Sequence, residues 1–202
     1  MRRRMHQFAA RQTADLIEAG SLGIDGFWDY ELAGEAMPSA IMQGEALVNI
    51  DPQNPKLLIG LAKAYVSYCF GWIQSEWEIA DLEGDFERAD AIERRVRTFY
   101  RRAADLGLRV VHARDTEGQL AALLERGDLE RVHSYLKAHF NAPEDVAPLY
   151  YAGLGWGSEM AFSGGDLAVL ADAPIARSLL ERSVEIDPSF NNASGLALLG
   201  TV

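Results

Sequence analysis

Residues 54–72 read NPKLLIGLAKAYVSYCFGW, and this stretch decides the fold class. Asn54 followed by Pro55 is typical of a helix start. The Asn side chain can accept hydrogen bonds from the free N–H groups of the first turn, and proline has no N–H group to leave unpaired. Apolar side chains then recur at helical spacing through the aromatic residues that end the stretch. The pattern predicts a long apolar helix over residues 56–74.

The preceding segment predicts a helix that pairs with this one. Apolar residues recur at helical spacing over 35–49, and the sequence DPQNP at 51–55 then breaks the chain sharply. Two helices joined by so short a break pack side by side as a helical hairpin.

Helical patterns fill most of the remaining chain. We expect helices over 4–19, 87–111, 116–126, 129–140 and 145–162, and a further one that ends at Ile186. Residues 20–34 read as a loop or a short irregular helix whose aromatic residues (Phe27, Trp28 and Tyr30) tuck under the next helix. Residues 76–90 read as an acidic helix and turn in contact with solvent. The chain is therefore predicted to be all-α.

Three glycines inside the helix expected at 145–162 point to close packing. Gly153, Gly155 and Gly157 each weaken an isolated helix by about 1 kcal/mol relative to alanine. Their presence predicts that another backbone lies close to this helix.

Length and charge restrict the classes of function. A chain of 202 residues fits one domain, and a net charge of −11 disfavours nucleic acid as a partner. Cys69 is the only cysteine, which excludes an intrachain disulfide and a cysteine-based metal cluster. The sequence shows neither an apolar run long enough to span a membrane nor a signal peptide.

An internal repeat is similar to the tetratricopeptide pattern of paired helices. Ile50-Asp51-Pro52 and Ile186-Asp187-Pro188 each close an amphipathic helix. Small and large residues stand near tetratricopeptide positions in the two copies: Leu58, Leu61, Ala62 and Tyr65 in one, and Ala176, Leu180 and Ser183 in the other. We expect helical hairpins with tetratricopeptide-like repeats, packed in one compact right-handed superhelical domain.

The order of several blocks resembles a more specific family, the T component of tripartite ATP-independent periplasmic (TRAP) transporters. The blocks are residues 35–38 (EAMP), 54–72, 99–103 (FYRRA) with 108–111 (LRVV), 149–156, 171–174 (ADAP), 179–182 and 185–188 (EIDP). The resemblance covers most of residues 35–195. Two departures are the missing lipobox cysteine and the missing helical region that follows in the family, so residues 1–202 are expected to be a single T component-like domain that lacks those C-terminal helices.

The resemblance implies a non-catalytic accessory protein, without cofactor or metal, that faces the periplasm and is membrane-anchored as a lipoprotein in its full-length form. It also implies a homotrimer that docks the solute-binding protein of the transporter and holds or passes a small, partly apolar ligand. The alternative is a tetratricopeptide-type adaptor that binds a peptide in a concave groove, which a shallow groove with basic side chains would favour. A third possibility, a helical enzyme with a carboxylate-rich site, has no motif in its support.

Six aromatic residues are the candidate ligand-binding positions: Tyr65, Tyr68, Trp72, Tyr150, Tyr151 and Trp156. Such residues either pack in the core or, if the resemblance holds, line a cleft for a partly apolar ligand. Glu130 and His133 form one Glu-x-x-His step, whereas a carboxylate-bridged metal pair needs two. No catalytic or metal residue is therefore assigned.

The arginines of the helix expected at 87–111 leave two interpretations open. Arg94, Arg95, Arg97, Arg101, Arg102 and Arg109 surround one apolar face. They form either an ordinary charged surface, offset by acidic residues on neighbouring turns, or a docking strip for an acidic segment or partner.

Overall fold

The computed structural model describes residues 2–20, 23, 25–164 and 167–200, and every regular element in these residues is helical. The elements are α1 (Arg2–Ala19), α3 (Tyr30–Ile50), α4 (Pro55–Tyr68), η1 (Cys69–Ile73), α5 (Gln74–Leu82), α6 (Phe86–Arg114), α7 (Leu120–Arg126), α8 (Leu129–His139), α9 (Pro143–Ala161), α10 (Leu167–Leu170), α11 (Ala173–Ile186) and α12 (Phe190–Leu199). The all-α prediction is confirmed. The predicted right-handed superhelix of tetratricopeptide-like units stays a prediction.

Short polar side chains start several of the helices, as the sequence indicates for α4. The Asn54 carboxamide accepts from the amides of Lys56 and Leu57, at 3.1 and 3.3 Å. The carboxylates of Asp29, Asp85 and Asp128 likewise accept hydrogen bonds from backbone N–H groups at the starts of α3, α6 and α8. Each cap satisfies amides that the helix itself leaves unpaired.

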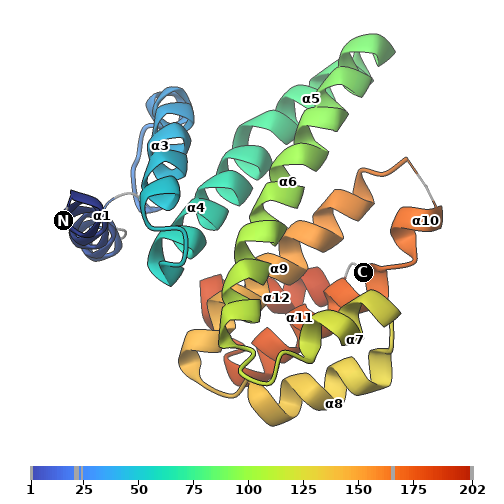
Figure 1. Cartoon of the computed structure of the whole chain (residues 1–202). Helices are drawn as coiled ribbons and strands as arrows, with labels where there is room; N and C mark the ends of the chain where they lie inside the picture. Colours follow the sequence, from blue (N-terminus) through green and yellow to red (C-terminus); the bar gives the residue numbers. More distant parts are fainter. Residues whose placement is uncertain (1, 21–22, 24, 165–166, 201–202) are drawn as a thin grey trace.

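The centre of the molecule is the pair α6 and α9 (Figure 1). Helices α4 and α5 pack against α6, and α11 packs against α9, whereas α3 packs on α4 and α8 packs on α11. One hydrophobic cluster lies where α3, α4, α6 and α9 meet, and a second lies where α7, α8 and α11 meet α6 and α9. The hairpin of α5 and the first part of α6 extends away from this body (Figure 1).

Glycines let the central helices approach closely. A Cβ atom at Gly155 would lie 2.6 Å from the Ala104 amide nitrogen of α6, and one at Gly153 would lie 2.8 Å from the Ala176 carbonyl oxygen of α11. The predicted close approach is therefore confirmed at these two positions, whereas a Cβ at Gly157 meets nothing within 4 Å. The two glycines face opposite neighbours, so α9 is held between α6 and α11.

The expected start of α3 is wrong. The helix begins at Tyr30, capped by Asp29, so Pro38 lies inside it and does not open it. The prediction that the aromatic residues of the expected loop are covered is wrong. Phe27, Trp28 and Tyr30 are 46%, 85% and 55% exposed, and Tyr30 belongs to α3. Ser21, Leu22 and Ile24 of the expected loop lie outside the described residues.

Two other helix boundaries differ from the expectation. The helix expected over 56–74 continues through η1, a π-helical turn, and α5 to Leu82 before the tight turn at Gly84. Helix α7 begins at Leu120, not Thr116, because the Asp115 carboxylate accepts from the amides of Gly118 and Leu120 and folds the intervening residues into a turn.

Candidate functional site

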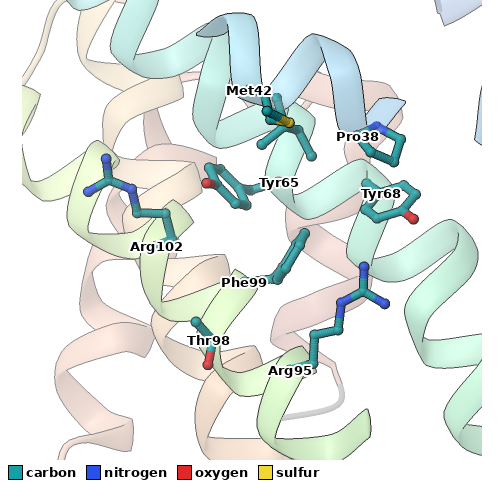
Figure 2. A pocket seen from close by; sticks show the side chains of 9 residues that line it. Pro38, Met42, Tyr65, Tyr68, Arg95, Thr98, Phe99 and Arg102 are labelled. Carbon is teal, nitrogen blue, oxygen red and sulfur yellow. The ribbon is translucent and has the colours of Figure 1, made fainter. Parts of the chain in front are cut away.

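A half-open apolar pocket in the described part of the chain lies between α3, α4 and α6. It has a volume of about 340 Å³, which is within the range of small-molecule sites. Apolar side chains make up most of its wall: Pro38, Ile41, Met42, Tyr65, Tyr68 and Phe99. Figure 2 shows Tyr65 and Tyr68 from α4 opposite Phe99 from α6, with Pro38 and Met42 of α3 at the rim.

Packing of the aromatic rings against one another fixes this wall. The rings of Tyr65 and Phe99 meet edge to face with their centroids 5.2 Å apart, and Tyr68 lies 6.0 Å from Phe99. Ile41 is buried beneath them, whereas Met42 is 74% exposed at the rim. The wall is therefore preformed, and the mouth carries a flexible side chain that can adapt to a ligand.

A charged network closes one end of the pocket. The Glu45 carboxylate of α3 accepts from Arg102 Nε and Nη2 of α6, at 2.7 and 2.6 Å, and from the Tyr65 hydroxyl at 2.8 Å. The hydrogen bonds from Arg102 lower the pKa of Glu45 below its ordinary value. Burial and the hydrogen bond to Glu45 raise the pKa of Tyr65 to about 12. The network holds Tyr65 in place as a neutral donor.

Trp72 supports the pocket from behind. The π-helical turn η1 carries its indole between Tyr30 and Tyr68, at ring-centroid distances of 4.7 and 5.7 Å. A Cβ atom at Gly34 would lie 2.3 Å from Trp72 Nε1, so the glycine leaves the space that this ring fills against α3. Single π-helical turns within α-helices are frequent at functional sites.

The structure places the six predicted aromatic residues in three locations. Tyr65 and Tyr68 line the pocket, and Trp72 lies directly behind it. Tyr150 and Tyr151 are buried with Phe190, where the Tyr150 hydroxyl is 2.7 Å from Ser194 Oγ. Trp156 packs against the second hydrophobic cluster, with the Arg101 guanidinium 5.9 Å from its ring. Tyr150, Tyr151 and Trp156 therefore do not line the pocket that Tyr65 and Tyr68 line.

Several pocket residues were not among the sequence candidates. Phe99 and Ile41 carry the same apolar pattern as the core, so helical spacing alone could not separate them from it. Glu45 and Arg102 come from different helices, and their pairing depends on how α3 packs against α6. Gly34 gave no signal, because it was expected to lie in a loop or a short irregular helix, and only the structure places it within α3 against Trp72.

The described residues contain neither a cluster of metal ligands nor a helix that could span a membrane. Glu130 and His133 lie on α8, and in the described ranges no three His, Cys, Asp or Glu side chains gather as metal ligands would. Among the same residues, no helix combines the length and apolar character needed to cross a membrane. The expectation that the protein binds no metal stays a prediction.

The family model described as TRAP transporter T-component matches residues 28–201. The chain belongs to the TRAP transporter T-component family. An uncharacterized protein of Treponema pallidum (strain Nichols) is 24% identical over 166 residues, which are 82% of this chain and 50% of that protein. The chain thus spans about half the length of this relative.

Family membership confirms the resemblance, and the description of the family names a component of TRAP transporters. The pocket between α3, α4 and α6 lies entirely within the matched residues.

Proposed function

We propose that this T-component protein is a non-catalytic accessory protein of a TRAP-type transporter. In this role it faces the periplasm, docks the solute-binding protein of the transporter, and holds a small, partly apolar ligand between α3, α4 and α6. The observation that carries the proposal is the preformed aromatic pocket within the part of the chain that matches the family. Tyr65 and Tyr68 are the ligand-contacting candidates, and Trp72 supports them.

The docking part is tested with two purified proteins. The solute-binding protein of a TRAP transporter from the same organism is mixed with this chain, and complex formation is followed by sedimentation velocity. A faster-sedimenting species containing both proteins supports docking. If the two proteins sediment independently at concentrations up to about 100 μM, where transient complexes of small interface area are still detected, docking is wrong.

We also propose that the protein assembles as a homotrimer. Light scattering on the purified chain is expected to give three times the chain mass of 22.3 kDa. A mass equal to one chain across the concentration range contradicts the trimer and leaves the pocket proposal to the ligand measurements.

A tetratricopeptide-type adaptor is the second candidate. A specific observation favours it, because a shallow groove lined by arginines of α6 opens beside the pocket. An adaptor is expected to bind an acidic peptide in this groove as a monomer, without needing the apolar pocket. Titration with a fluorescent peptide of six glutamates separates the two functions.

A further inference from the structure

The two ends of the apolar pocket carry different charged groups. Figure 2 shows Arg102 at one end and Arg95 at the other, with Tyr65 and Phe99 between them. Both arginines belong to α6, where they lie two helical turns apart, so their Cα atoms are separated by about 10 Å along the helix. One small ligand in the pocket can therefore contact a different group at each end.

The positive charge at the Arg102 end is offset within the protein. The Glu45 carboxylate accepts two hydrogen bonds from Arg102 and one from the Tyr65 hydroxyl. The guanidinium and the hydroxyl at this end thus share one acceptor. A ligand gains little there from a negative charge, because its carboxylate would be repelled by Glu45.

The Arg95 end has no anionic partner. Among the residues that the structure describes, the Arg95 guanidinium forms neither an ion pair nor a hydrogen bond. Aromatic rings hold it at the pocket instead, with its Cζ atom 5.4 Å from the centroid of the Phe99 ring and 6.0 Å from that of the Tyr68 ring. A cation over a ring face is attracted by the ring and keeps its N–H groups for an acceptor.

Tyr68 supplies a second donor at the same end. Its side chain is largely buried, at 9% exposed, and within the described part of the chain its hydroxyl has no hydrogen-bond partner. Figure 2 shows this hydroxyl on the same side of the pocket as the Arg95 guanidinium. A polar group in apolar surroundings is stabilised by gaining a partner. Two donors that lack an acceptor therefore lie together beside an apolar wall.

We propose that the pocket binds an apolar ligand that carries a single carboxylate. The apolar body of the ligand packs on Phe99 and Met42, and its carboxylate accepts hydrogen bonds from the Arg95 guanidinium and the Tyr68 hydroxyl. The two oxygens of a carboxylate can accept from both donors at once, and hydrogen bonds to an ionised acceptor are the stronger ones. This inference rests on the ligand-holding part of the proposed function and adds the charge of the ligand and its position.

The far end of the pocket selects against a second carboxylate on the same ligand. Arg102 is already paired with Glu45 there, so a second negative charge would lose its hydration without gaining an unpaired cation. A ligand with one charged end and one apolar end matches both halves of the site.

The test compares three probes that share a phenylbutyl body. Isothermal titration calorimetry is carried out with 4-phenylbutyrate, with the uncharged 4-phenylbutanamide and with the dicarboxylate 4-(4-carboxyphenyl)butanoate. We expect 4-phenylbutyrate to bind at least about tenfold more tightly than either of the other two. The advantage over the amide should shrink as added salt screens the Arg95 charge.

Variants locate the effect. Arg95→Gln is expected to lose the preference for 4-phenylbutyrate and to bind 4-phenylbutanamide as the parent does. Tyr68→Phe keeps the ring and should weaken 4-phenylbutyrate by roughly threefold to tenfold. The matched control Arg94→Gln removes the same charge from the neighbouring exposed residue, which does not line the pocket, and should keep the preference. Circular dichroism and thermal melting verify that each variant is folded.

The outcomes separate this inference from the function on which it rests. Equal binding of the acid and the amide overturns the carboxylate site and leaves the apolar pocket intact. Binding of the dicarboxylate at least as tightly as 4-phenylbutyrate overturns the single charge. A loss of preference in Arg94→Gln as large as in Arg95→Gln overturns the assigned donor, because the general charge of α6 would then explain it. Binding of none of the probes at concentrations up to about 5 mM overturns both the inference and the ligand-holding function.

Discussion

Replacing Gly155 with alanine tests the close contact of α9 with α6. The added Cβ would lie 2.6 Å from the Ala104 amide nitrogen and 2.7 Å from the Tyr100 carbonyl oxygen. Both atoms belong to backbone in the middle of a long helix, so relief requires α6 and α9 to separate by several tenths of an ångström. Such overpacking typically costs about 1–3 kcal/mol.

Helix propensity opposes this cost. Alanine is favoured over glycine in a helix interior by about 1 kcal/mol. The net expectation for Gly155→Ala is a destabilisation of up to about 2 kcal/mol, which for a chain of this size lowers the melting temperature by up to roughly 8 °C.

Gly157→Ala is the matched control in the same helix. A Cβ at this position meets nothing within 4 Å, so only the gain in helix propensity remains. We expect the control to be stabilised by about 0.5–1 kcal/mol. Urea denaturation and differential scanning calorimetry measure both variants. If the two substitutions shift stability in the same direction and by a similar amount, the close contact between α9 and α6 is refuted.

Three further predictions concern the core and the polar networks. Phe140→Ala, at a side chain that is 1% exposed, should cost about 3–5 kcal/mol in urea denaturation, whereas Phe86→Ala, at 68% exposed, should cost less than about 0.5 kcal/mol; similar losses would contradict the assigned burial. Tyr135→Phe removes a hydroxyl that donates to the Asp115 carboxylate at 2.5 Å and should cost about 1.5–3 kcal/mol; an unchanged urea midpoint would exclude this bond in solution. The lowered pKa of Glu45 means that its carboxylate stabilises the folded state above the ordinary pKa of 4.5, and that this contribution is lost as the pH falls through the lowered value. The stability difference between the parent and Glu45→Gln should therefore be largest at neutral pH and shrink toward zero in acid, and a difference independent of pH would contradict the network.

The sequence predicted the helices best where local signals agree. Asn54 and Pro55 start α4, and Gly127 with Asp128 separates α7 from α8, because caps and breaks depend on a few adjacent residues. The expected start at residue 35 failed, since the sequence alone could not show that α3 would begin at Tyr30. The stacking of Tyr30 on Trp72 supports this first turn.

The candidate site was predictable only in part. Tyr65 and Tyr68 were identified from an aromatic pattern, and they line the pocket. Tyr150 and Tyr151 carry the same kind of pattern, but they are buried among core residues. An aromatic residue at helical spacing can face either environment, because the spacing defines a face of the helix and does not define what covers it.

The sequence by itself determined the helical class, most helix boundaries and the family, because these depend on local spacing and on the order of short blocks along the chain. Only the tertiary structure decided which residues share a site. The pairing of Glu45 with Arg102 joins residues 57 positions apart, and the π-helical turn at Cys69–Ile73 places Trp72 behind Tyr68. Both depend on how closely α3, α4 and α6 pack, and that distance is set by side chains from all three helices at once.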